Sequence, residues 1–341
     1  MDIFKRLWAR MNEPKTERVL IILIPCFTLF VIIVILAPTV LALLESPPAA
    51  IAPPSVSVSP EILPAETSHI PDAADSDPSG EIFFETEQED ASSDDLSTEM
   101  NGWYTISGET CYLQPDGSLA VGLRQIDGKL CYFNSAGIKA KALGIDVSFY
   151  NDRISWESVK AQGIDFAIIR TGYRGWETGL LHEDDCFRRN ITGAVHAGVD
   201  VGVYFFSTAV TPAEAAEEAG FVISCLDGQE LAYPVYMDIE QSGMYPYGRS
   251  DRLNKAARMA TIEAFCKVIT DNGYEAGVYS SKYFLENNLP LEGLSRYDVW
   301  LANYTRNNRM PDFSGRYDMW QFTETGFVSG VNGIVDMNVV Y

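Results

Sequence analysis

The stretch that most constrains the fold of this chain is residues 233–240, Tyr-Pro-Val-Tyr-Met-Asp-Ile-Glu. Successive side chains of a strand point to opposite faces, so Asp238 and Glu240 share one face with Tyr236, while the other face is apolar. A strand inside an α/β barrel has this pattern, because helices cover its apolar back and a ligand meets its polar front. The alternative is an antiparallel strand with a solvated acidic face, which the bulk of Tyr236 and the flanking helical segments disfavour.

The pattern alternates between strands and helices from residue 143 to the end of the chain. Strands are expected at 144–150, 166–173, 199–207, 233–240, 275–281, 298–304, 317–323 and 333–341. Helices are expected at 156–162, 183–197, 212–226 and 252–272, with Thr211 as N-cap and Pro212 in the first turn of the third. Eight strands predict an α/β fold, a TIM-like (β/α) barrel. The short polar connection 305–316 makes the barrel irregular in its second half.

The first and last of these strands also carry acids on their polar faces, Asp146 and Asp336. Because the first and last strands of a closed barrel are neighbours, these two should lie side by side, with Asp238 and Glu240 at the same mouth. Four carboxylates in one pocket suggest glycoside hydrolysis, in which one carboxyl is kept protonated by its neighbours. Binding of a divalent metal ion is the competing interpretation of such a cluster.

Eight short motifs follow one another in this part of the chain. They are Gly144-Ile-Asp-Val-Ser148, Phe166-Ala-Ile-Ile-Arg-Thr-Gly-Tyr173, Val201-Gly-Val-Tyr204, Pro234-Val-Tyr-Met-Asp-Ile-Glu240, Gly277-Val-Tyr-Ser280, Trp300-Leu-Ala-Asn-Tyr304, Trp320-Gln-Phe322 and Val335-Asp-Met-Asn338. In these motifs and their order, residues 143–341 resemble the family 25 glycoside hydrolases, the Chalaropsis-type lysozymes or N-acetylmuramidases.

The resemblance implies cleavage of the β-1,4 bond between N-acetylmuramic acid and N-acetylglucosamine in peptidoglycan, without a cofactor or a metal. By matched position, Glu240 is the expected proton donor and Asp238 its partner, which positions the acetamido group of the substrate as the nucleophile. Asp146 and Asp336 complete the acidic floor. Two neighbours on one strand face cannot easily flank a sugar from opposite sides, which fits this arrangement.

Residues near the strand ends are candidates for contact with the sugar rings. They are Tyr173, Tyr204, Tyr279, Trp300, Tyr304, Trp320 and Asn338. Phe205 stands where many members of the family carry a His, which affects one subsite contact. Arg170 is expected to pair with the acidic cluster or with a muramyl carboxylate, or else to form a structural salt bridge.

Residues 101–142 contain an internal repeat of twenty residues, in which 102–117 aligns with 122–137. Turn glycines and aromatic strand residues predict a β-hairpin from each copy. The copies resemble the cell-wall-binding repeats of Gram-positive surface proteins, but Leu123 stands in place of Trp103, which favours a structural spacer over a ligand-binding module. Cys111 and Cys131 hold equivalent positions, so a disulfide between them is one option.

The N-terminal hundred residues indicate an anchor and a tether. Residues 1–18 are basic, and 19–44 are free of charge, which predicts one transmembrane helix with the N-terminus in the cytoplasm and the barrel outside the cell. A long cleaved signal peptide is the alternative. Residues 45–100 hold fourteen Asp and Glu and no Lys or Arg, and their many prolines predict a disordered, extended linker.

Composition excludes several function classes. A net charge of −22 disfavours a nucleic-acid partner. Three histidines and the absence of a C-x-x-C pair disfavour a structural zinc site and a wall amidase or peptidase. The sequence therefore predicts a membrane-anchored, extracellular peptidoglycan hydrolase whose partners are the glycan strands and the membrane, with residues 101–142 as a candidate wall contact. The alternative is a non-catalytic, peptidoglycan-binding surface anchor.

Overall fold

The computed structural model describes residues 101–241, 248–306 and 309–341. The predicted cytoplasmic segment, transmembrane helix and acidic linker lie outside these residues. Within the described ranges no helix has the length and apolar character needed to cross a membrane.

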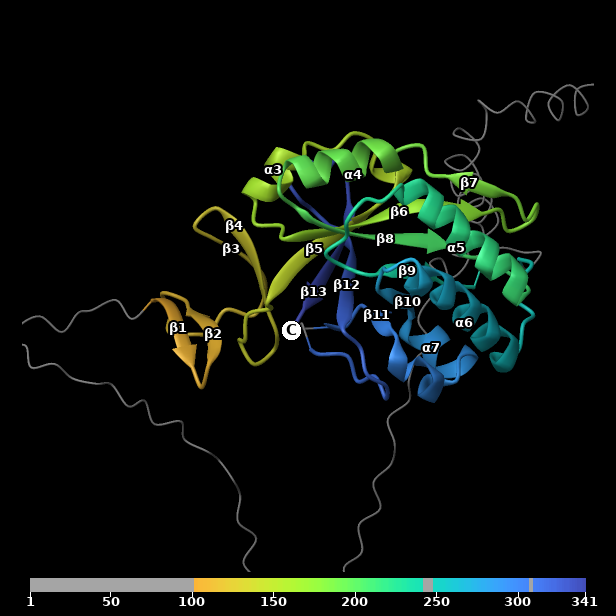
Figure 1. The fold of residues 1–341 in the computed structure, drawn as a ribbon. Coiled ribbons are helices and arrows are strands. Elements are labelled where there is room, and N and C mark those ends of the chain that lie inside the picture. The colour runs from red at the N-terminus through yellow and green to blue at the C-terminus, as the bar shows by residue number, and fades with distance from the viewer. Residues whose placement is uncertain (1–100, 242–247, 307–308) are drawn as a thin grey trace, which may run out of the picture. The chain divides into compact units, whose positions relative to one another are not determined.

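A closed barrel forms the main body of the described chain (Figure 1). Its strands in chain order are β5 (Ala142–Val147), β6 (Phe166–Arg174), β8 (Asp200–Phe206), β9 (Val235–Asp238), β10 (Ala276–Ser281), β11 (Asp298–Ala302), β12 (Met319–Gly326) and β13 (Val335–Val340). Each strand pairs with the next, and β5 closes the barrel by pairing with both β6 and β13. The strands from β5 to β12 are parallel, whereas β13 is antiparallel to both of its neighbours. The predicted irregular α/β barrel is confirmed.

Helices cover the outside of the barrel. They are α3 (Trp156–Ala161), α4 (Phe187–His196), α5 (Pro212–Leu226), α6 (Lys255–Asp271) and α7 (Lys282–Asn288), with 3-10 turns η1 (Phe149–Asn151) and η2 (Leu291–Arg296). The side chain of Thr211 caps α5 and Pro212 opens it, as predicted. The helix expected from residue 183 begins later, because β7 (Leu181–Glu183) pairs with β6 instead.

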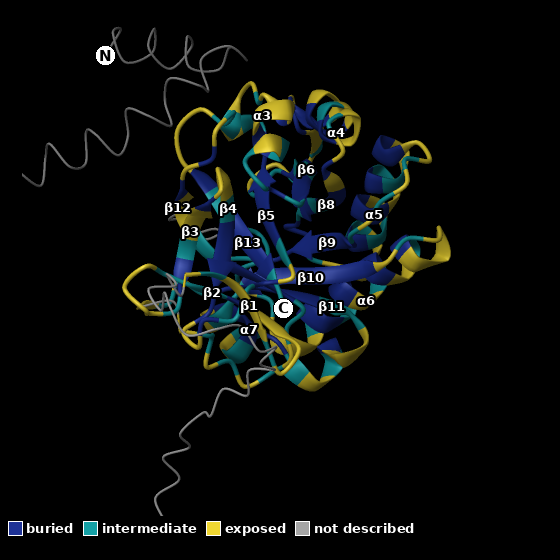
Figure 2. Cartoon of the chain, turned by 90° about the vertical axis from the view of Figure 1, so that its left-hand side faces the viewer, coloured by how far each residue is buried: buried dark blue, intermediate teal, exposed yellow. Residues whose placement is uncertain are grey.

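Two apolar clusters separate the inside of the barrel from the outside. Outward residues of the strands, such as Val203, Val235 and Val278, pack with the helices. Inward residues, among them Phe166 and Trp300, fill the barrel itself. Figure 2 shows the strands buried along most of their length. The interior is therefore a packed core, and a site can form only above it, at the strand ends.

Two β-hairpins precede the barrel, as the repeat predicts. They are β1 (Gly102–Ile106) with β2 (Glu109–Leu113), and β3 (Gly122–Ile126) with β4 (Lys129–Phe133). Each turn has two residues with positive φ, the second a glycine, as in the tight turns that match strand twist.

The second hairpin packs on the barrel through Tyr132, whose ring centroid lies 4.3 Å from that of Phe322 and 5.8 Å from that of Trp320. Cys111 and Cys131 are both buried and carry free thiols.

Candidate active site

The four acids singled out by the sequence converge at one end of the barrel. Asp146 and Asp336 are direct partners across the β5–β13 pair, as expected for first and last strands. Asp238 ends β9, and Glu240 follows it by two residues. The charge of Glu240 acts on the pKa of both Asp146 and Asp238, and that of Asp336 acts on the pKa of Glu240. We call these four residues the acidic floor.

Asp146 and Asp336 share one proton. The side-chain amides of Gln321 and Asn338 donate to Oδ2 of Asp146 at 2.8 and 2.9 Å, which favours its ionised form. Burial nevertheless raises the pKa of Asp146 to about 6. For Asp336, burial and the neighbouring charge of Asp146 raise the pKa to about 8. At neutral pH the proton therefore resides on Asp336, which hydrogen-bonds to Asp146.

Asp238 and Glu240 are also held toward their protonated forms. Burial and the charge of Glu240 raise the pKa of Asp238 well above its ordinary value, against the opposing effect of Arg170. Among the described residues, Oδ1 of Asp238 is buried and has no hydrogen-bond partner. Burial raises the pKa of Glu240, a hydrogen bond with Tyr279 opposes this, and the charges of Asp336 and Glu324 add to it. A buried polar atom normally has a partner, so Asp238 Oδ1 is a natural contact for a bound molecule.

Gln321 organises the groups above the floor, and it was not among the site residues predicted from the sequence. The hydroxyls of Tyr279 and Tyr304 each donate to its Oε1 at 2.9 Å, while its Nε2 donates to Asp146. Strand alternation was the available signal, because Gln321 lies two residues from the interior residue Met319.

Three of the aromatic candidates lie inside the barrel. The rings of Tyr204 and Tyr279 contact Trp300, with centroids 5.9 and 4.3 Å away. Trp300 is only 1% exposed and donates from Nε1 to Oδ1 of Asn338 at 2.8 Å, so it supports the floor from below. The predicted stacking of a sugar on Trp300 is not possible in this position, because other rings cover it.

The other aromatic candidates differ in position. Tyr304 is 47% exposed at the mouth, and Tyr173 stacks on His182 of β7 at 4.9 Å. Trp320 is not brought to the acidic floor. Since Gln321 points inward, Trp320 points outward, where its Nε1 donates to the carbonyl of Asn303 and its ring packs with Tyr132.

Arg170 forms the structural salt bridge that the sequence left as one option. Its Nε and Nη2 lie 2.8 and 2.7 Å from Oδ2 of Asp184, which also accepts from the backbone N–H of Phe149. The guanidinium lies 4.8 Å from the ring centroid of Phe149. Asp184 was not predicted, because no local pattern links it to a residue fourteen positions earlier on another element.

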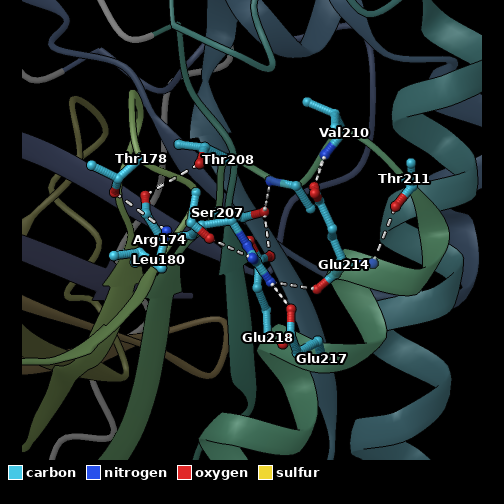
Figure 3. A network of polar contacts seen from close by, with 12 residues as sticks. Arg174, Thr178, Leu180, Ser207, Thr208, Val210, Thr211, Glu214, Glu217 and Glu218 are labelled. Carbon is cyan, nitrogen blue, oxygen red and sulfur yellow. Dashed lines mark hydrogen bonds and ion pairs between the residues drawn. The ribbon is translucent and has the colours of Figure 1, made fainter.

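A second group of buried charges lies beside the site (Figure 3). Arg174 Nε donates to Oε1 of Glu218 at 2.7 Å, and Ser207 Oγ donates to Oε2 of Glu218 at 2.6 Å. Glu217 is a second, exposed partner of Arg174 at 2.8 Å. The backbone N–H of Ser207 donates to the carbonyl of Asp238 at 2.9 Å. This group, the Arg174 network, therefore ties α5 to the strand that carries Asp238.

Comparison with known proteins gives a consistent result. The family model "Glycosyl hydrolases family 25" matches residues 145–331. Lysozyme M1 of Streptomyces globisporus is 29% identical over 208 residues, which are 57% of this chain and 66% of that protein. Autolytic lysozyme of Clostridium acetobutylicum is 23% identical over 196 residues, which are 57% of this chain and 54% of that protein.

Among solved structures, the modular autolysin LytC of Streptococcus pneumoniae, in complex with a synthetic peptidoglycan ligand, aligns with a TM-score of 0.56 and 25% identity. The alignment covers 70% of this chain and 58% of LytC. The chain thus spans between about half and two thirds of the length of each of these three proteins.

Proposed function

Since this chain belongs to glycosyl hydrolases family 25 and is a glycoside hydrolase of the lysozyme type, we propose that it is a peptidoglycan hydrolase that cuts the β-1,4 bond between N-acetylmuramic acid and N-acetylglucosamine. The observation that carries the proposal is the acidic floor, in which burial and like charge raise the pKa of Asp238, Glu240 and Asp336. A carboxyl whose pKa is held above its ordinary value is what glycoside hydrolysis requires of its general acid. The synthetic peptidoglycan ligand bound by LytC supports the choice of substrate.

Glu240 acts as the general acid and base in this proposal. Its raised pKa favours the protonated form, whose proton the leaving glycosidic oxygen takes up as the bond to the sugar breaks. The resulting carboxylate then accepts a proton from the water that completes hydrolysis. The hydroxyl of Tyr279, whose single proton goes either to Gln321 or to Glu240, orients the carboxyl and limits the rise in its pKa when it donates to Glu240.

Asp238 positions the nucleophile, the acetamido group of the substrate. It ends β9 two residues before Glu240, which places their Cα atoms about 6.5–7 Å apart where the chain is extended. Its Oδ1, which has no partner in the described chain, accepts from the acetamido N–H as the acetamido oxygen attacks the anomeric carbon. Asp146 and Asp336 form the base of the pocket, and above about pH 8, where Asp336 ionises, its charge adds to the pKa of Glu240.

Product analysis tests the proposal. The full chain and its Glu240→Gln variant are incubated with purified peptidoglycan, and the reduced products are identified by mass spectrometry. We expect new reducing ends at N-acetylmuramic acid for the wild type and none for the variant. Glu230→Gln, an exposed carboxylate in the segment that leads to β9, is the matched control and should behave as the wild type.

Two other results would change the assignment. Reducing N-acetylglucosamine would keep the hydrolase and overturn the bond specificity. Sedimentation of the wild type with the wall, without any products, would favour the non-catalytic anchor.

We also propose that the enzyme is anchored in the cell membrane and faces outward. The support is the charge-free run 19–44 behind a basic segment, and the acidic, proline-rich stretch that follows it. The hairpins at 101–142 then separate this tether from the barrel. Protease added to wall-stripped cells should remove the barrel while the N-terminal segment stays in the membrane fraction. A barrel that remains intact would instead lie inside the cell, which would contradict the proposed orientation.

A further inference from the structure

A cavity of about 450 Å³ lies apart from the acidic floor. Arg153 and Ser155 line it from the segment that follows η1, Gly330 and Asn332 from the segment that precedes β13, and Arg189 from the first turn of α4. The backbone N–H of Ser155 donates to the carbonyl of Gly330 at 2.8 Å and joins the two segments. We call this cavity the arginine pocket.

The pocket is positive in a strongly acidic chain. Its lining contains two arginines and no Asp or Glu, whereas the chain carries a net charge of −22. Within the described part of the chain, Arg153 makes no hydrogen bond or ion pair. Arg189 donates to the carbonyl of Asp152 at 2.6 Å and lies 3.9 Å from its carboxylate. Arg153 therefore has its full set of donors available for an anion, and a guanidinium suits a carboxylate best.

The pocket lies at the mouth end of the barrel. One of its two segments follows β5, which carries Asp146, after the short turn η1, and the other leads into β13, which carries Asp336. Asn332 precedes Asp336 by four residues, so their Cα atoms are at most about 14 Å apart. Between pocket and floor, Asn151 Nδ2 donates to the carbonyl of Ile334 at 3.4 Å. A molecule bound over the floor can therefore reach the arginines.

We propose that the arginine pocket binds a carboxylate of the peptide stem that the muramic acid residues of the substrate carry, an inference that rests on the proposed function. A stem of four or five residues spans at most about 15–18 Å when extended, which exceeds the upper limit of about 14 Å between Asn332 and Asp336. Stem peptides carry free carboxylates along their length and at their end. The pocket thus selects glycan whose stems are present over glycan from which they have been removed.

Matched substrates test this selection. The full chain, Arg153→Gln and Arg189→Gln are assayed on glycan strands with their stem peptides and on the same strands after an amidase has removed the peptides. For each variant we expect KM to rise about fivefold on the peptide-bearing strands, with kcat nearly unchanged, because a partly exposed ion pair to the substrate is lost. On stripped strands both constants should equal those of the wild type. Lys160→Gln, on α3 outside the pocket, removes the same charge and should change neither.

Calorimetry with the free stem tetrapeptide tests binding without turnover. Binding by the wild type that weakens about fivefold in Arg153→Gln supports the pocket even when the wild type releases no products, a result that would overturn the proposed function alone. Active wild type with no tetrapeptide binding overturns the pocket alone. Equal losses on both kinds of strand, or a loss that appears only on walls bearing phosphate polymers, also overturn it.

Discussion

Buried carboxyls occur in two neighbouring groups at the same end of the barrel, and they are neutralised in different ways. In the Arg174 network, the side chain of Glu218 is fully buried, and each of its oxygens accepts a hydrogen bond, from Arg174 and from Ser207. In the acidic floor, carboxyls face other carboxyls, and Oδ1 of Asp238 has no partner among the described residues. In the first group Arg174 and Ser207 oppose the burial that raises the pKa of Glu218 to about 7, whereas in the second group neighbouring carboxylates add to the effect of burial.

This difference distinguishes a carboxyl that stabilises the fold from a carboxyl that takes part in the reaction. A carboxylate with both oxygens occupied by fixed donors has nothing left for a ligand, and it holds its neighbours in place. Carboxyls that crowd together keep protons at neutral pH and can pass them to a substrate. We therefore expect changes in the floor to alter activity, and changes in the Arg174 network to alter stability.

The largest expected effect is on turnover. Glu240→Gln should lower kcat about 10²–10⁴-fold, the usual contribution of a general acid, because an amide cannot protonate the leaving oxygen. Its melting temperature should not fall, since the change removes a buried carboxyl whose pKa burial has raised. Steady-state kinetics and thermal unfolding measure both. If Glu240→Gln melts at a temperature far below that of the wild type, the floor also stabilises the fold, and the distinction between the two groups is lost.

The Arg174 network should show the reverse behaviour. Glu218→Gln leaves the buried Arg174 with two backbone carbonyls and, among the described residues, the exposed Glu217 as its one charged partner, and should lower the free energy of unfolding by about 3 kcal/mol. Chemical denaturation measures this change, and kcat per folded molecule should stay close to that of the wild type. Glu217→Gln removes the exposed partner of the same arginine and should cost less than about 1 kcal/mol. Equal losses of unfolding free energy in Glu218→Gln and Glu217→Gln would show that the burial of Glu218 does not determine its contribution to stability.

The sequence was sufficient for the barrel and for its acidic floor. Alternation in eight segments predicted the strands, and closure of the barrel then required Asp146 and Asp336 to be neighbours. Contacts between distant elements were not predictable. Arg170 pairs with Asp184, and Trp320 packs on Tyr132 of a hairpin, because the partner in each case is chosen by tertiary packing. The three residues of β7 were too few and too polar to distinguish from the start of a helix.

Proton uptake by the floor predicts how stability depends on pH. Asp336 has a pKa of about 8 in the folded chain against an ordinary value of 3.8, so the native state keeps a proton that the unfolded chain loses. The free energy of unfolding should therefore fall as the pH rises from about 4 to about 8. Asp336→Asn should weaken this decline and be more stable than the wild type at pH 8, by several kcal/mol.

Denaturation at several pH values measures the decline, with the exposed Asp312→Asn as control. If the free energy of unfolding depends on pH in the same way in Asp336→Asn and in the wild type, Asp336 is ionised at neutral pH. Asp146 and Asp336 then do not share a proton.

The smallest effect concerns charge at a distance. The carboxylate of Glu324, an exposed residue of β12, raises the pKa of Glu240, so Glu324→Gln should lower it. The alkaline limb of the pH profile of kcat/KM should then move to lower pH by a few tenths of a unit, and the shift should vanish at about 1 M salt, where screening acts within about 3 Å. Glu217→Gln removes an exposed charge beside the other group of buried carboxyls and should leave the limb where it is. If both variants move it equally, the pH profile reports the net charge of the whole domain, and the floor does not titrate as a separate unit.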